Sequence, residues 1–219
     1  MGNSTTNETE LKYHVPQLPN PAALAEELTA LGWHVYGTTT KDHSDTYVSD
    51  QGGALGKLRA ALRWRFEDNQ YVVAIKQELG TDGAHFERFE LEAIAGPPAH
   101  AAHGLVLGFD PGDVPPTIAA WLADNNVAGP FHTHAWLVTT RTVLRAGATG
   151  VLAEFALDHV QARVPGGEGM HEFYEVECEY QARAGHPLIT NTANLLAQLP
   201  GATPSWASKL DVALSQFAK

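Results

Sequence analysis

Residues 171–181 read HEFYEVECEYQ, and their alternation of charged and apolar side chains decides the fold. Successive side chains of a β-strand point to opposite faces, so a strand here places Glu175, Glu177 and Glu179 together. The opposite face then carries an apolar row: Tyr174, Val176, Cys178 and Tyr180. The pattern predicts a strand with one ionic and one apolar face.

The same period of two recurs along the chain and predicts a fold dominated by strands. We expect strands at 7–15, 33–40, 43–49, 59–67, 70–78, 85–94, 132–145, 151–160 and 171–181. Helices are expected at 21–31, 98–107, 115–125, 187–199 and 204–217. No internal repeat or long linker divides the sequence, which predicts a single α+β domain over residues 1–219 with a frayed end at residues 1–6.

Composition narrows the function classes. The 219 residues include 14 Lys and Arg against 25 Asp and Glu, and the net charge of −11 disfavours nucleic acid and anionic membranes as partners. The single cysteine, Cys178, cannot form an internal disulfide and fits a reducing compartment. We therefore expect a cytoplasmic protein that acts on a small molecule, with its oligomeric state left open.

The ionic faces of the strands are sorted by sign. Acids dominate the first and last strands, whereas Arg63, Arg65 and Lys76 lie in the middle ones. These faces also carry eight of the 14 cationic residues: Lys12, Arg63, Arg65, Lys76, Arg88, Arg141, Arg145 and Lys209. An ordinary sheet with one solvated face would explain any single strand. The sorting across the set favours ionic faces that turn inward around a closed barrel.

Charges enclosed in this way need compensation, because burying an unpaired charge costs several kcal/mol. The acids would need a cation, and carboxylate oxygens favour Mg²⁺, Mn²⁺ or Ca²⁺ over zinc. The arginines and lysines would need an anion of high charge density, such as a small polyphosphate. The residues alone thus predict a metal and polyphosphate site.

A family resemblance rests on the same residues. Glu8-Thr9-Glu10-Leu11-Lys12 resembles the ExExK signature of the CYTH superfamily, also called triphosphate tunnel metalloenzymes. Further matching motifs follow in order: DTY at 45–47, LRWR at 62–65, AIK at 74–76, RFELE at 88–92, Arg141, Glu154 with Asp158, EVECE at 175–179, and Ser208-Lys209. The resemblance implies an eight-stranded antiparallel β-barrel, the triphosphate tunnel, with helices packed outside.

The resemblance also implies roles for individual residues. Mg²⁺ or Mn²⁺ would be held by Glu8, Glu10, Asp158, Glu175, Glu177 and Glu179. The phosphates would be bound by Lys12, Arg63, Arg65, Lys76, Arg88, Arg141, Arg145 and Lys209. The implied chemistry is hydrolysis of inorganic triphosphate, thiamine triphosphate or a nucleoside triphosphate by in-line attack of water. Glu90, a last-strand glutamate or Lys12 would accept the proton.

Two positions depart from the family pattern. Thr139 and Val212 stand where the family often has a cation, so we expect a shorter or less charged substrate or weaker activity. Arg145 would compensate in part. A class IV adenylyl cyclase and a non-catalytic polyphosphate-binding protein are therefore alternative functions. Residues 96–130 carry no motif, and we expect helices there outside the barrel.

Overall fold

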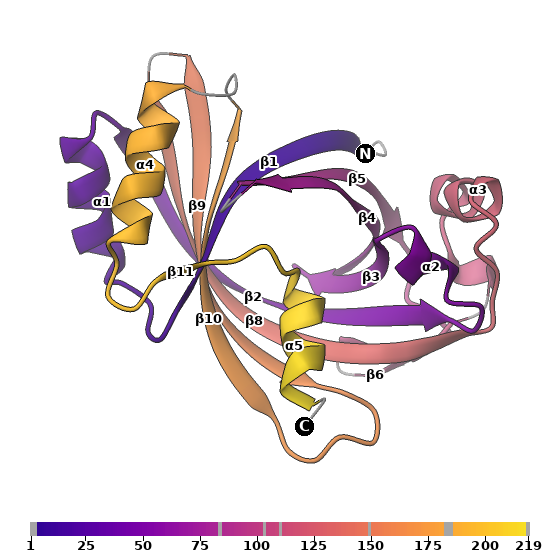
Figure 1. Ribbon diagram of the computed structural model, residues 1–219. Helices are drawn as coiled ribbons and strands as arrows, with labels where there is room; N and C mark the ends of the chain where they lie inside the picture. The colour runs from indigo at the N-terminus through magenta and orange to yellow at the C-terminus, as the bar shows by residue number, and fades with distance from the viewer. Residues whose placement is uncertain are drawn as a thin grey trace.

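A closed barrel of eight antiparallel strands forms the centre of the protein (Figure 1). The structure is a computed structural model that describes residues 4–82, 85–102, 104–109, 111–148, 150–181 and 186–217, with the backbone alone at 4–8, 81–82, 85–86 and 111. The strand order is β10-β9-β8-β2-β3-β4-β5-β1, and pairing of β1 with β10 closes the barrel. The strands are β1 (Ser4–Val15), β2 (His34–Asp50), β3 (Ala60–Glu67), β4 (Gln70–Asp82), β5 (His85–Ala95), β8 (Phe131–Ala148), β9 (Val151–Arg163) and β10 (His171–Gln181).

The helices and short strands lie around this barrel. They are α1 (Pro21–Ala30), α2 (Ala54–Lys57), β6 (His100–Ala102), β7 (Leu105–Gly108), a 3₁₀ turn (Pro111–Asp113), α3 (Pro116–Asp124), α4 (Pro187–Ala197), β11 (Thr203–Pro204) and α5 (Lys209–Phe217). Asn20 caps α1, because its Oδ1 accepts hydrogen bonds from the N–H groups of Ala22 and Ala23. None of the described helices is both long and apolar enough to cross a membrane.

Most of the apolar core lies outside the barrel wall, as the strand faces predict. One cluster joins β1, β8, β9 and β10 to α1 and α4, which lie side by side in Figure 1, and it includes Leu28, Phe155 and Cys178. A second cluster joins the outer face of β3, β4 and β5 to α2 and α3, and it includes Trp64 and Ile118. The outer face is thus covered, which leaves the ionic residues facing the lumen.

A third apolar cluster involves α5. Val212 and Ala213 of α5 pack against Tyr47, Leu137 and Phe173. These three strand residues occupy the same alternate positions as the ionic ones, so they point to the lumen side. The helix therefore covers an apolar end of the barrel interior. This packing gives a physical reason for valine at position 212, since an arginine there would be buried in an apolar cluster.

Three segments differ from the sequence-based expectation. The helix predicted at 98–107 is wrong, because β6 and β7 form a two-stranded sheet there. Gly104 between them has φ +79°, a conformation that favours glycine in a turn, and the Val106 N–H donates to Thr46 Oγ1 at 3.0 Å. Other strands are longer than expected: β2 is continuous, since Lys41 and Asp42 stay paired with β8, and β1 already begins at Ser4, within the segment expected to fray.

Candidate functional site

The barrel encloses a cavity of about 700 Å³. Its described lining includes most residues predicted for the site: Glu10, Lys12, Arg63, Arg65, Lys76, Arg88, Glu90, Arg141, Glu177, Glu179 and Lys209. They come from six strands and from α5. The ionic faces thus meet across one enclosed space, and the inward orientation predicted from their sorting is confirmed.

Three carboxylates form an acidic cluster at one wall of this cavity. Asp158 of β9 and Glu175 of β10 are direct register partners, and Glu177 is the next inward residue of β10. One oxygen from each of the three lies within 4.8 Å of the others, and all three residues are buried. Their meeting follows from the strand alternation, because inward positions of neighbouring antiparallel strands lie opposite each other.

Lys209, the first residue of α5, projects its ammonium group into the acidic cluster. Its Nζ lies 2.5 Å from Glu177 Oε1, 2.9 Å from Glu175 Oε2 and 3.0 Å from Asp158 Oδ2. Burial opposes the charge, but attraction to the three carboxylates prevails and raises the pKa of Lys209. The ammonium group therefore stays protonated at neutral pH and supplies positive charge that the cluster requires.

Two further cations complete the acidic cluster. Arg141 of β8 donates to both oxygens of Asp158, at 2.8 and 2.6 Å, and to Glu177 Oε2 at 2.8 Å. Lys12 of β1 lies with its Nζ 3.0 Å from Glu177 and 3.4 Å from Glu10. Burial alone would raise the pKa of Glu177, but Lys209, Lys12 and Arg141 together hold it well below its usual range. Glu177 is thus an ionised hub between three cations.

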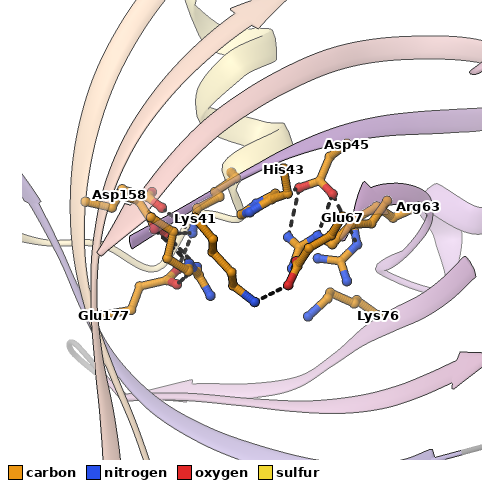
Figure 2. Close-up of polar contacts among 12 residues, drawn as sticks. Lys41, His43, Asp45, Arg63, Glu67, Lys76, Asp158 and Glu177 are labelled. Carbon is orange, nitrogen blue, oxygen red and sulfur yellow. Dashed lines mark hydrogen bonds and ion pairs between the residues drawn. The ribbon is translucent and has the colours of Figure 1, made fainter. Parts of the chain in front are cut away.

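The opposite arrangement occurs at β2 and β3, where one carboxylate lies beside two guanidinium groups. Asp45 is fully buried, and Arg65 donates to it through Nε at 2.8 Å and through Nη2 at 2.9 Å (Figure 2). Arg63 Nε lies 3.8 Å from the same carboxylate. Burial works against ionisation, but Arg65 and Arg63 outweigh it and hold the pKa of Asp45 well below its usual range. We call Asp45, Arg63 and Arg65 the arginine cluster.

Ion pairs on β4 and β5 link the two clusters around the barrel. Arg63 also donates to Glu92 at 3.0 Å, and Lys76 Nζ lies 2.5 Å from Glu90 Oε1. Arg88 Nη2 lies 2.8 Å from Glu10 Oε2, which connects β5 to β1. Each of these cations therefore already has an acidic partner, and a bound anion would have to share it.

Sequence reasoning missed the inner face of β2. Lys41 forms an ion pair with Glu67, and Lys41, His43 and Asp45 occupy alternate positions of the strand (Figure 2). Asp45 stood in a quoted motif without a role, and Lys41 and His43 were not considered. The signal was present in the alternation, but dividing β2 at Lys41 concealed it.

Three predicted site residues do not line the described cavity, namely Asp158, Glu175 and Arg145, and the side chain of one falls outside the description. Arg145 pairs with Glu154 near the rim, where their side chains are 41% and 51% exposed. Thr139 is fully buried in β8. The side chain of Glu8 lies outside the described residues, although its backbone pairs with Arg88. Arg145 therefore lies at the rim rather than in the described cavity lining, and its partial compensation for a cation at Thr139 stays a prediction.

The donor set of the acidic cluster fits a hard divalent cation. All its ligand atoms are carboxylate oxygens, which Mg²⁺ and Mn²⁺ prefer. Glu175 Oε1 is buried without a hydrogen-bond partner among the described residues, although buried acceptors are normally satisfied. The ammonium group of Lys209 contacts one oxygen of each carboxylate in the cluster. A metal ion bound there would share these carboxylates with Lys209.

The family assignment follows from a match along most of the sequence. The model for the CYTH domain matches residues 6–200. The chain belongs to the CYTH family. This CYTH protein has no match among curated protein sequences. The family match covers every strand of the barrel and the acidic cluster, while Lys209 lies beyond it.

Solved structures share the fold of this CYTH protein at low identity. HpAC1 from Hippeastrum, assigned as an adenylyl cyclase and described as having a dominant triphosphatase activity, is 23% identical, with a TM-score of 0.62 and coverage of 95% of this chain and 96% of that chain. A protein from Bacillus halodurans assigned as an adenylate cyclase is 17% identical, with a TM-score of 0.60 and coverage of 98% and 99%. A protein from Pyrococcus horikoshii is 16% identical, with a TM-score of 0.51 and coverage of 95% and 99%.

Proposed function

We propose that this protein hydrolyses a triphosphate substrate in a reaction that depends on a divalent metal ion. The observation that carries the proposal is that one cavity is lined both by Glu177 of the all-carboxylate cluster, with Glu10 and Glu179, and by a set of buried and partly buried arginines and lysines. The first suits a hard cation and the second a polyphosphate. Membership of the CYTH family and the triphosphatase activity described for HpAC1 support this assignment.

The two clusters would divide the work of binding. Asp158, Glu175 and Glu177, with Glu10 and Glu179 nearby, would hold Mg²⁺ or Mn²⁺, which supplies Lewis-acid stabilisation of charge on the phosphates. The phosphate oxygens would be bound by Lys12, Arg63, Arg65, Lys76, Arg88, Arg141 and Lys209. These groups are held in place by their carboxylate partners, so little reorganisation would be needed to neutralise the transferred phosphoryl group.

Proton transfer would fall to a carboxylate rather than to Lys12. Burial opposes the charge of Lys12, but Glu10 and Glu177 raise its pKa, so it remains an ammonium group that suits phosphate binding. Glu90 lines the cavity and remains our first candidate for the acceptor. Glu179 is the second, because burial and the charge of Glu10 raise its pKa and make it a stronger base than an ordinary glutamate.

An adenylyl cyclase that releases pyrophosphate is a second candidate. The cavity lining also includes apolar and small residues: Tyr47, Leu55, Gly56, Leu210 and Leu214. These residues would contact an organic group attached to the phosphates. A nucleotide would therefore fit the same site with its phosphates among the cations.

A substrate panel separates these functions. The purified protein would be incubated with inorganic triphosphate, thiamine triphosphate or ATP, each with Mg²⁺, Mn²⁺ or a chelator. Metal-dependent release of orthophosphate supports hydrolysis, whereas cyclic AMP with pyrophosphate supports the cyclase. Tight binding of all three compounds without turnover would indicate a non-catalytic polyphosphate-binding protein. Glu10→Gln, which removes a carboxylate beside the acidic cluster, is expected to abolish the metal-dependent reaction.

A further inference from the structure

His43 is a buried histidine in the wall of the tunnel that the proposed reaction does not use. It lies on β2, which is hydrogen-bonded to β3 on one side and to β8 on the other. Its side chain is 0% exposed, and its direct register partner on β8 is Thr139, which is also fully buried. Figure 2 places His43 beside Asp45 on the lumen side of the strand.

The polar atoms of this pair are not satisfied. Nδ1 of His43 and Oγ1 of Thr139 are buried without a hydrogen-bond partner among the described residues. Nε2 of His43 lies 3.5 Å from Asp45 Oδ2, too far for a good hydrogen bond. Buried polar atoms in folded proteins are normally paired. We therefore expect these atoms to gain a partner when a ligand binds, either a ligand atom or a proton taken up with the substrate.

The charges that face His43 come from three strands. Lys41 and Asp45 lie on β2 itself, Arg65 and Glu67 on β3, and Arg141 on β8. Burial lowers the pKa of His43, the nearby carboxylate of Asp45 opposes this effect, and Arg65 and Arg141 lower the pKa further. The ring is therefore neutral at pH 7 in the free protein, between two permanent cations.

We propose that His43 is a proton-binding residue of the triphosphate site, which becomes protonated when a triphosphate anion lies against Arg65 and Arg141. The inference rests on the proposed function, because it needs an anion of high charge density at these two arginines. The protonated ring donates to Asp45 through Nε2 and to a phosphate oxygen or an enclosed water through Nδ1. Substrate binding and proton uptake are then coupled at this residue.

The sign of the coupling follows from linkage. An anion that neutralises Arg65 and Arg141 raises the pKa of His43, so binding takes up a proton in the interval between the free and bound pKa values. Triphosphate affinity therefore rises as the pH falls through that interval, by up to about tenfold per pH unit. A histidine with only a structural role would give no such dependence.

Calorimetry of the full chain with inorganic triphosphate tests the proposal. Titrations at pH 7 with a chelator, in two buffers of different ionisation enthalpy, count the protons taken up on binding. We expect the wild-type protein to take up more than His43→Gln, with the difference approaching about one proton. His34→Gln is the matched control, since the same change is made at an exposed position of the same strand and should keep the wild-type count.

A second measurement uses the wild-type protein alone, in case His43→Gln does not fold. NMR of the histidine side chains, with and without inorganic triphosphate, should reveal one buried ring whose pKa lies below 6.5 in the free protein and rises on binding. Triphosphate binding with equal proton counts, or with no buried histidine that shifts, overturns the inference alone. Failure of the wild-type protein to bind triphosphate both with the chelator and with Mg²⁺ or Mn²⁺ would overturn the proposed function together with it.

Discussion

The two charged clusters of the tunnel are reversed in sign. In the acidic cluster one ammonium group, Lys209, lies among three carboxylates at 2.5 to 3.0 Å. In the arginine cluster one carboxylate, Asp45, lies beside two guanidinium groups. The three carboxylates of β9 and β10 are balanced only together with Lys12 and Arg141 from the neighbouring strands, whereas the two guanidinium groups of β3 outnumber Asp45.

This difference indicates what each cluster can bind. Excess carboxylate at β9 and β10 favours a cation, and excess guanidinium at β2 and β3 favours an anion. The barrel keeps them apart because β8 lies between β9 and β2 in the sheet, which prevents them from neutralising each other directly. Mutations in the acidic cluster should therefore affect metal binding first, and mutations in the arginine cluster triphosphate binding first.

The largest effect is expected from Glu177→Gln. The change leaves Lys12, Lys209 and Arg141 buried with one carboxylate fewer, and breaking buried ion pairs in this way costs about 3–5 kcal/mol. Urea unfolding should show this loss, and calorimetry should show weakened Mg²⁺ or Mn²⁺ binding. Glu154→Gln is the matched control at an exposed ion pair and should cost less than about 1 kcal/mol. Equal stability of the two variants would show that Glu177 is not the hub.

A smaller and different effect is expected from Arg65→Lys. Lysine keeps the charge but cannot donate the two parallel hydrogen bonds that Arg65 makes to Asp45, so the cation loses its fixed orientation. We expect triphosphate to bind about tenfold more weakly while metal affinity stays the same. The comparison is made by titrating each ligand separately into the variant and into Arg145→Lys, where the side chain lies near the rim. Loss of metal affinity in Arg65→Lys would contradict the division between the clusters.

The strand faces were predictable from sequence, whereas the contacts between clusters were not. Alternation in segments such as 171–181 is a local property of an extended chain, so it fixed which residues share a face. The placement of Lys209 against Glu175 and Glu177 depends on how α5 packs onto the barrel, which is set by Val212 and Ala213 in the third apolar cluster. No local pattern in the sequence encodes that approach.

Two errors have local causes. His100–Ala102 and Leu105–Gly108 form strands because Gly104 turns the chain and Val106 bonds to the barrel, whereas short apolar runs do not distinguish helix from strand. The sequence-based prediction divided β2 between strands at 33–40 and 43–49, next to Lys41 and Asp42. Pairing with Arg141 on β8 keeps the strand intact there, and this tertiary interaction outweighs local preference.

Acid should weaken the acidic cluster in the wild-type protein more than in Glu177→Gln. Burial raises the pKa values of Asp158 and Glu177, but nearby cations outweigh this and lower them below 3.8 and 4.5, respectively. Their ionisation therefore stabilises the fold above those values, and this contribution is lost as the pH falls through the lowered pKa values. Urea unfolding between pH 7 and pH 3 should give a steeper decline for the wild-type protein. Parallel declines would contradict the assignment of the lowered pKa to Glu177.

The smallest effect is expected from Arg145→Ala, which tests whether the rim belongs to the arginine cluster. Arg145 and Glu154 form an ion pair with a distance of 2.8 Å, but both side chains are largely exposed and the pair is screened by solvent. We expect a stability change below about 1 kcal/mol and an unchanged affinity for inorganic triphosphate at physiological salt. A fall in affinity as large as that in Arg65→Lys would extend the phosphate-binding surface to the rim. In that case Arg145 would compensate for the cation that Thr139 does not provide. The phosphate-binding surface would then include β8, and its boundary with the acidic cluster would lie at β9.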